Sequence, residues 1–223
     1  MLHDWRIAPR EYARQEARRG RRHAFEALDP TRTALVVIDM VPFFLTENAY
    51  ARGIVPNIRS LADALRAAGG TVAWVLPGSA DPSAAAIELR GQEVAERYRT
   101  SGGTGPLHER LGSAFDIADD DLLVEKDAAS AFFPGRCMLP ACLEERAIDT
   151  VLVTGTVANV CCESSARDAS TLGYRTIMVA DANAARRDQD LNATLHTFYR
   201  SFGDVRPTSE VLHMIAEPAS RTG

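Results

Sequence analysis

The segment TVLVTGTVANVCCESSARDASTLGYRTIMVAD, residues 150–181, decides the fold. It opens with an apolar run (150–155), continues through a stretch rich in small residues (160–173), and closes with a second apolar run (174–181). Short runs that are apolar throughout are typical of strands buried on both faces of a parallel sheet. The stretch between them ends at Gly173, a residue type that commonly terminates helices. We therefore predict a strand–helix–strand unit.

The same alternation of strands and helices extends over the rest of the chain. Strands that alternate with helices predict a parallel sheet covered by helices on both faces. The other predicted elements are strands at 33–39, 71–76 and 121–126, helices at 57–70, 139–149 and 191–203, a helix or loop at 83–102, and a short strand with a turn of helix after residue 203.

The length and composition fit one domain of ordinary size. The chain has 223 residues, and 46% of them are hydrophobic, so a full core can form without metals or disulfides. We assign residues 1–30 to an N-terminal extension and residues 31–223 to the domain. The extension contains the Arg-rich run EARRGRR (16–22), which we interpret as a solvated arm or helix, with contact to an anionic partner as the alternative.

The composition favours neither a nucleic acid nor a membrane as a partner. The net charge is −5, and no apolar run approaches the roughly 20 residues of a membrane span. The N-terminal residues lack the apolar core of a signal peptide. The four cysteines include no CxxC spacing and are too few for a disulfide framework in a chain of this length. We therefore expect a cytoplasmic protein.

Three chemically active side chains follow the predicted strands. Asp39 ends the strand at 33–39, Lys126 ends the strand at 121–126, and Cys161 follows the strand at 150–155. Ligands of open parallel sheets bind outside the carboxyl ends of the strands. An acid, an amine and a thiol at one sheet edge indicate nucleophilic catalysis. Taken singly, each has a structural alternative: a turn cap, a surface lysine and a small core residue.

The adjacent cysteines Cys161 and Cys162 are predicted to have different roles. A helix that begins near Val160 places Cys161 in its first turn, where free N–H groups and the helix dipole favour a thiolate. Cys162 starts a series of small residues at helical spacing that continues through Ala166 and Ala169, and it is interpreted as a packing residue. The remaining cysteines, at positions 137 and 142, are interpreted as structural.

Three motifs resemble those of the isochorismatase-like cysteine hydrolases. They are ALVVIDM, VEKDAASAF and VTGTVANVCCESSARDASTLGY, and the similarity covers roughly residues 31–207. The third motif is the most specific, because members of that family carry Asn-Val-Cys before an acidic and Ser/Thr-rich run. The cysteine after Asn-Val is the family nucleophile and corresponds to Cys161.

The resemblance implies a three-layer α/β/α, Rossmann-like fold with a mostly parallel six-stranded sheet. It also implies an Asp39–Lys126–Cys161 catalytic triad and a cis peptide bond between Thr156 and Val157. The backbone N–H groups of Val157 and Cys161 would then form an oxyanion hole. Members of the family are commonly homodimers or homotetramers, so we expect a homo-oligomer.

The same resemblance implies hydrolysis of a C–N bond through a thioester acyl-enzyme. True isochorismatases act without a cysteine nucleophile, so Cys161 favours C–N cleavage. The nicotinamidase branch carries an Asp-x-His metal motif after its second strand, which WVLPGSADPS lacks, and the five histidines show no ligand spacing, so we expect no metal and no cofactor. The remaining substrate classes are amides, ureides such as N-carbamoyl compounds, and lactams of the streptothricin type.

Departures from the family pattern affect the expected substrate pocket. The first strand end reads DMVPFF (39–44), with Val, Pro and Phe where many members carry Gln, Asn and Asp, so Phe43 and Phe44 are expected at an apolar pocket mouth. Phe132 and Phe133 are candidates either for the pocket or for the core.

A binding or scaffold paralogue without turnover is the alternative function. A nucleotide-binding protein is not supported, because no GxGxxG or Walker loop follows a strand.

Overall fold

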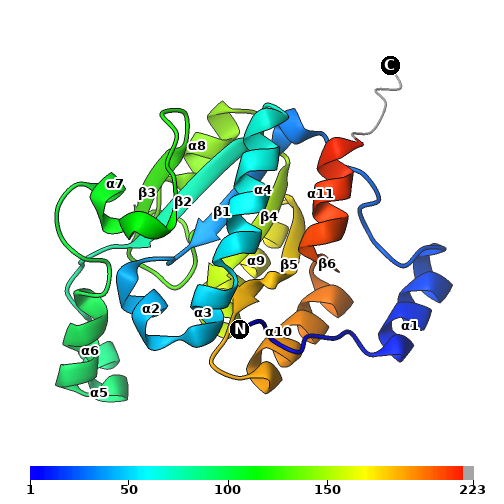
Figure 1. The fold of residues 1–223 in the computed structure, drawn as a ribbon. Coiled ribbons are helices and arrows are strands. Elements are labelled where there is room, and N and C mark those ends of the chain that lie inside the picture. The colour runs from blue at the N-terminus through cyan, green and yellow to red at the C-terminus, as the bar shows by residue number, and fades with distance from the viewer. Residues whose placement is uncertain (218–223) are drawn as a thin grey trace.

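The computed structural model describes residues 1–217 and contains one six-stranded sheet flanked by helices (Figure 1). The strand order is β3-β2-β1-β4-β5-β6, and every neighbouring pair is parallel. This confirms the predicted three-layer α/β/α class. The strands are β1 (Thr33–Ile38), β2 (Thr71–Pro77), β3 (Leu122–Lys126), β4 (Thr150–Thr156), β5 (Arg175–Ala184) and β6 (Asp204–Arg206).

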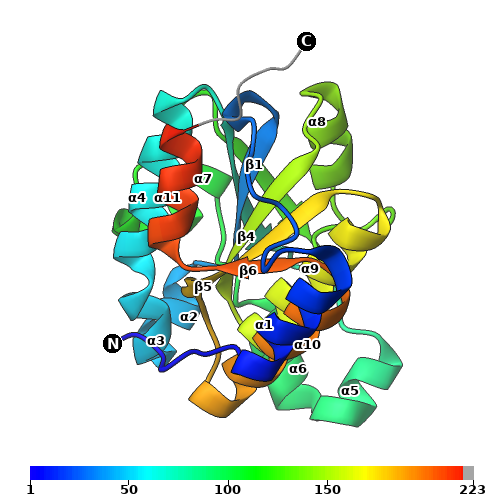
Figure 2. The same ribbon diagram turned by 90° about the vertical axis from the view of Figure 1, so that its right-hand side faces the viewer.

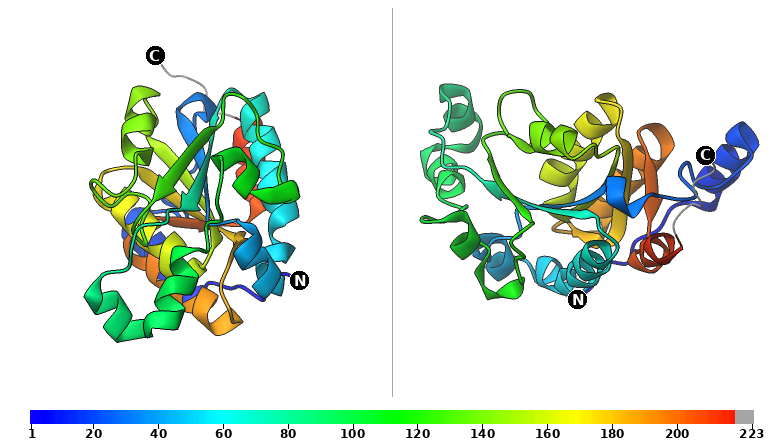
Figure 3. Two further views of the ribbon diagram at one scale, coloured as in Figure 1. Left: turned by 90° about the vertical axis from the view of Figure 1, so that its left-hand side faces the viewer. Right: turned by 90° about the horizontal axis from the view of Figure 1, so that it is seen from above.

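Helices cover both faces of the sheet, as the view from above shows (Figure 3). One face carries α4 and α11, and the other carries α8, α9 and α10. The α-helices are α1 (Pro9–Arg19), α2 (Pro42–Glu47), α3 (Ala49–Gly53), α4 (Val55–Ala67), α5 (Ala84–Arg90), α6 (Gln92–Arg99), α7 (Leu107–Arg110), α8 (Leu139–Glu145), α9 (Glu163–Thr171), α10 (Asp188–Ser201) and α11 (Thr208–Ala216). Short helical turns are η1 (Pro30–Arg32), η2 (Gly112–Ala114) and η3 (Ala158–Cys162).

The continuous apolar strands supply both halves of the core. In β1, Val36 and Ile38 pack toward α9 and α10, whereas Leu35 and Val37 pack toward α4 and α11. Successive side chains of a strand point to opposite faces, so a strand buried on both faces must be apolar at every position. All six residues of β1 are buried, which is why the sequence pattern identified this strand.

The N-terminal extension forms a helix that is docked on the domain. Figure 2 shows α1 lying alongside α10. The rings of Tyr12 and Tyr199 meet edge to face with centroids 5.3 Å apart, and Glu11 pairs with His196 at 3.3 Å. Before the helix, the His3 ring is buried and accepts a hydrogen bond from the N–H of Ala185 at 3.1 Å. The extension therefore has a solvated face and a packed face.

Several helices differ from the sequence expectation. α8 ends at Glu145, before the predicted end at 149, because Ala147 takes a positive φ of 53° that a helix does not allow. The short helices α2 and α3 fill a region for which no element was predicted. Their single turns are too short to show a helical period in the sequence.

The close approach of β4 to β1 depends on Gly155. Its φ is +116°, and a Cβ atom built there would lie 2.2 Å from the carbonyl oxygen of Ile38. A side chain at this position would therefore push apart the two strands that carry Asp39 and Cys161.

Gly155→Ala is expected to lower the free energy of unfolding by about 2–4 kcal/mol, because backbone strain and a clash with a strand add together. Gly20→Ala is the matched control, since Gly20 also has a positive φ (+76°) but no atom within 4 Å of the added Cβ. Its cost should be about 1 kcal/mol. Urea unfolding of the three proteins measures the difference, and equal losses in the two variants would contradict the close-approach argument.

Candidate active site

The carboxyl edge of the sheet brings Asp39, Lys126 and Cys161 together. Asp39 follows β1, Lys126 is the last residue of β3, and Cys161 lies in η3 after β4. The Nζ atom of Lys126 is 3.0 Å from Oδ2 of Asp39 and 3.5 Å from Sγ of Cys161. The three residues selected from the sequence thus meet through one ammonium group.

Lys126 reaches this position by crossing a whole strand. β2 lies between β3 and β1, and neighbouring strands are about 4.8 Å apart, so only a long side chain placed at the end of β3 can reach Asp39. An ammonium group has three donors. The third is directed at the carbonyl oxygen of Ala128, 3.2 Å away. All three donors of Lys126 are therefore matched to acceptors.

The ion pair of Asp39 and Lys126 is almost fully removed from solvent. Their side chains are 1% and 4% exposed. Burial alone would lower the pKa of Lys126, but the Asp39 carboxylate and Cys161 outweigh this and raise it, so the ammonium form is favoured. Oδ1 of Asp39 has no hydrogen-bond partner among the described residues. This buried oxygen is a free acceptor on the carboxylate that shares the Lys126 ammonium with the thiol.

The surroundings of Cys161 favour the neutral thiol over the thiolate. Burial is the largest cause, and the Asp39 carboxylate adds to it, so that the pKa of Cys161 rises to about 12 despite the nearby Lys126 charge. This direction is opposite to the one that the sequence expectation of a helix dipole at Cys161 gives. The carboxylate was left out of that expectation, and the backbone at Cys161 is a short π-helical turn rather than the first turn of an α-helix.

Cys162 faces the core instead of the site. It is fully buried, as are Ala166 and Ala169 one and two turns later, and its Sγ contacts the carbonyl oxygen of Thr154 at 3.9 Å. Cys161 is only partly buried. The two neighbours thus have the different environments that the spacing of small residues predicts. Gly173, the last member of that series, lies beyond α9 and is exposed.

Ser165 supports the turn that carries Cys161 and was not identified from the sequence. Its hydroxyl donates to the carbonyl oxygen of Cys161 at 2.7 Å and accepts from the N–H of Ala131 at 2.9 Å. It therefore joins the turn that holds Cys161 to the loop that follows Lys126. A serine four residues after the nucleophile was the available signal, because such a hydroxyl can bond the carbonyl of the preceding turn.

The backbone around the site has two unusual conformations. Asp39 has a φ of 55°, a left-handed value that costs a non-glycine residue about 1–2 kcal/mol. The peptide bond between Thr156 and Val157 is cis. Among residues 1–217, no acceptor is found for the N–H of Val157, whereas its carbonyl oxygen accepts from the N–H of Val160 at 2.9 Å. The Val157 N–H is thus available at the start of the turn that carries Cys161.

The four phenylalanines proposed for the pocket have different positions. Phe43 and Phe44 are partly exposed on α2, directly after Asp39, with their rings edge to face and centroids 5.0 Å apart. Phe133 is 52% exposed. Phe132 is buried in the core against the ring of Tyr174, which precedes β5 at the opposite sheet edge. Phe132 therefore belongs to the core and not to the pocket mouth.

The described part of the chain contains no group of three or more His, Cys, Asp or Glu side chains that could hold a metal ion. Cys137 and Cys142 are free thiols and partly buried. Within residues 1–217, no helix combines the length and the apolar character needed to cross a bilayer.

Comparison with known proteins identifies the family. Residues 33–210 match the isochorismatase domain. The ureidoacrylate amidohydrolase RutB of Agrobacterium fabrum is 28% identical over 87% of this chain and 95% of its own. Among solved structures, a cysteine hydrolase from Pseudomonas syringae pv. phaseolicola has a TM-score of 0.75 and 28% identity over 86% of this chain and 95% of its own. The N-carbamoylsarcosine amidase of Thermoplasma acidophilum has a TM-score of 0.63 and 28% identity over 79% of this chain and 96% of its own. The sequence resemblance is confirmed, and the chain belongs to the isochorismatase family.

Proposed function

We propose that the protein is a cysteine-dependent hydrolase that cleaves a C–N bond of a small molecule through a thioester acyl-enzyme. The observation that carries the proposal is the contact of one buried ammonium, that of Lys126, with both the Asp39 carboxylate and the Cys161 thiol. Two relatives support the choice of bond, because ureidoacrylate and N-carbamoylsarcosine, from which they take their names, both carry a carbamoyl group on nitrogen. Ureido compounds are thus the first substrate class to test, before simple amides and lactams.

The first chemical step requires a proton transfer, because the resting thiol is neutral. Asp39 takes the proton of Cys161 on its unpartnered oxygen, and the resulting thiolate adds to the carbonyl carbon of the substrate. Lys126 retains its positive charge throughout and stabilises the negative charge as it moves from the carboxylate to the sulfur. The C–N bond then breaks, and the leaving nitrogen takes the proton from Asp39.

The second half of the cycle regenerates the thiol. Asp39, again a carboxylate, removes a proton from water, and the resulting nucleophile attacks the thioester. The acid product leaves and Cys161 recovers its proton. In both tetrahedral intermediates, the negative oxygen is proposed to accept hydrogen bonds from the backbone N–H groups of Val157 and Cys161. Preorganised donors of this kind act where charge develops and need no rearrangement.

Cys161→Ala should abolish hydrolysis while the protein still folds, because the nucleophile is lost but no core atom is. Cys162→Ala is the matched control and should keep turnover, with a loss of about 1 kcal/mol in the free energy of unfolding, because a buried thiol packs as a small apolar group. A panel of ureides, amides and lactams, with mass spectrometry of the covalent adduct, measures hydrolysis in both variants. Urea unfolding measures the stability loss in Cys162→Ala. Absence of turnover and of any adduct across the panel would instead favour a binding or scaffold paralogue.

Asp39→Asn should make Cys161 easier to alkylate while it abolishes hydrolysis. The Asp39 carboxylate raises the pKa of the thiol, so its removal leaves Lys126 to favour the thiolate. In the wild type, with a thiol pKa of about 12, the rate of alkylation by iodoacetamide should increase about tenfold per pH unit between pH 7 and 10. In the variant, the rate at pH 8 should be higher. A slower rate in Asp39→Asn than in the wild type would contradict this account.

Val157→Pro tests the proposed oxyanion hole, because proline has no N–H. The φ of Val157 is −84°, close to the range of proline, and no described hydrogen bond is lost. We expect kcat to decrease by about 10²–10³-fold with little change in stability. Val157→Ala keeps the N–H and should keep kcat. Equal rates for the two variants would exclude this N–H from the mechanism.

A further inference from the structure

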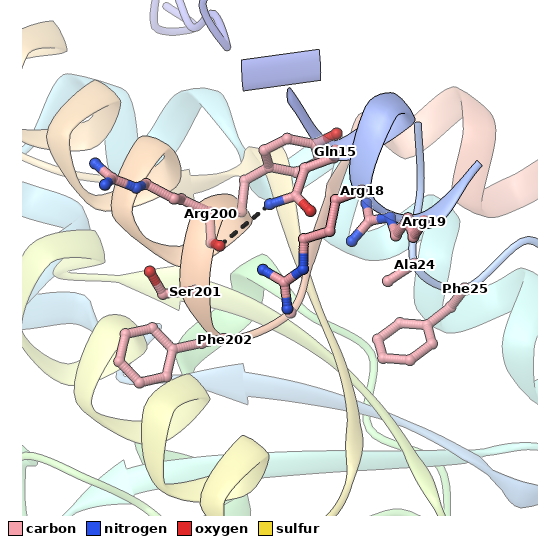
Figure 4. A pocket seen from close by; sticks show the side chains of 10 residues that line it. Gln15, Arg18, Arg19, Ala24, Phe25, Arg200, Ser201 and Phe202 are labelled. Carbon is pink, nitrogen blue, oxygen red and sulfur yellow. Dashed lines mark hydrogen bonds between the residues drawn. The ribbon is translucent and has the colours of Figure 1, made fainter. Parts of the chain in front are cut away.

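A cavity lies between the N-terminal extension and α10, at the opposite edge of the sheet from Cys161. Its volume is about 230 Å³. Several of its residues directly precede β6, and so lie at the amino end of that strand, whereas the catalytic residues follow the carboxyl ends of their strands. The lining residues are Gln15, Arg18, Arg19, Ala24, Phe25, Tyr199, Arg200, Ser201, Phe202 and Gly203 (Figure 4).

The lining is strongly basic although the protein as a whole is acidic. Three arginines line the cavity and no Asp or Glu does, while the whole chain has a net charge of −5. Among residues 1–217, Arg18 and Arg200 form no ion pair with a carboxylate, and the Arg19 guanidinium donates to the carbonyl oxygens of Arg21 and Arg22. Arginines without a carboxylate partner provide bidentate donors for a bound anion.

The acidic groups around the cavity are already engaged. Glu11, on which the charge of Arg200 acts, pairs with His196 at 3.3 Å and with Arg10 at 3.4 Å. Glu16 pairs with Arg22 at 3.1 Å. Asp204 pairs with His23 at 2.9 Å and lies 3.5 Å from the guanidinium of Arg206. None of these carboxylates forms an ion pair with an arginine that lines the cavity, although the charge of Arg200 acts on Glu11.

A buried polar atom in the cavity wall lacks a partner. Gln15 is 2% exposed, and its Nε2 donates to the carbonyl oxygen of Arg200 at 3.2 Å. Its Oε1 has no hydrogen-bond partner. An unsatisfied buried acceptor is unfavourable, so a ligand whose hydrogen-bond donor reaches Oε1 would gain from this contact.

The cavity also has aromatic walls. In Figure 4 the side chain of Arg18 extends between the rings of Phe25 and Phe202. Each ring also contacts the guanidinium group of an arginine outside the lining. The Cζ atom of Arg175 lies 5.0 Å from the ring centroid of Phe25, and that of Arg167 lies 4.5 Å from the ring centroid of Phe202. Aromatic and guanidinium planes together favour a flat ligand.

We propose that this cavity is a binding site for a small, flat anion that carries one carboxylate or phosphate group and one N–H or O–H donor. The anionic group binds the arginines, the donor satisfies Oε1 of Gln15, and the flat portion lies against the phenylalanines. The volume is below the roughly 300–1,000 Å³ of sites for drug-sized ligands, which limits the ligand to about one ring and its substituents. This site is independent of the proposed hydrolase chemistry.

Calorimetric titration of the full chain with four probes tests the proposal. 2-Aminobenzoate has a carboxylate and a donor, benzoate lacks the donor, aniline lacks the anion, and phenyl phosphate supplies the phosphate form. We expect saturable binding of 2-aminobenzoate or phenyl phosphate, weaker binding of benzoate, and none of aniline. Whether 2-aminobenzoate or phenyl phosphate binds more tightly distinguishes a carboxylate from a phosphate ligand. If neither 2-aminobenzoate nor phenyl phosphate shows saturable binding, the proposal is overturned.

Variants locate the bound probe. Arg18→Gln should weaken binding at least about tenfold, as expected for loss of a charged hydrogen bond. Arg14→Gln removes the same charge from the same helix but outside the cavity, so it should bind as the wild type does. Gln15→Leu should remove the preference for 2-aminobenzoate over benzoate. Equal affinity in Arg18→Gln and Arg14→Gln would place the probe elsewhere, including the active site, and would also overturn the proposal.

Discussion

The contact of the Lys126 ammonium with Asp39 and Cys161 depends on the whole sheet. The three groups come from three strands, and the lysine is separated from the aspartate by a fourth. Their distances are therefore set by strand register, not by local sequence. In turn, the buried ion pair fixes the charge state of the site, since each member compensates the other where water cannot. A change in the register of β1, β2 or β3 would leave the charge of Asp39 or Lys126 buried without its partner.

The carboxylate of the same ion pair disfavours ionisation of the Cys161 thiol. A carboxylate beside a thiol opposes a second negative charge, and burial opposes it further. In the proposed mechanism, transfer of the thiol proton to Asp39 keeps one negative charge next to the Lys126 ammonium, because the charge moves from the oxygen to the sulfur. The left-handed backbone of Asp39 directs this carboxylate into the site, at the cost of local strain.

Patterns that act over the whole fold were readable in the sequence, and local adjustments were not. The apolar strands, their parallel direction and the strand-end residues Asp39, Lys126 and Cys161 follow from burial and topology. The π-helical turn at Cys161 and the support from Ser165 depend on contacts between distant loops, which no periodicity reveals. The core position of Phe132 depends on its contact with a distant ring. The cytoplasmic location and the homodimer or homotetramer stay predictions from sequence.

The raised pKa of Cys161 has a consequence for the oxidation of this side chain. Peroxides oxidise thiolates and attack protonated thiols slowly, so a cysteine with a pKa of about 12 resists sulfenic acid formation. Vulnerability would be confined to the brief interval in which the proton has moved to the carboxylate.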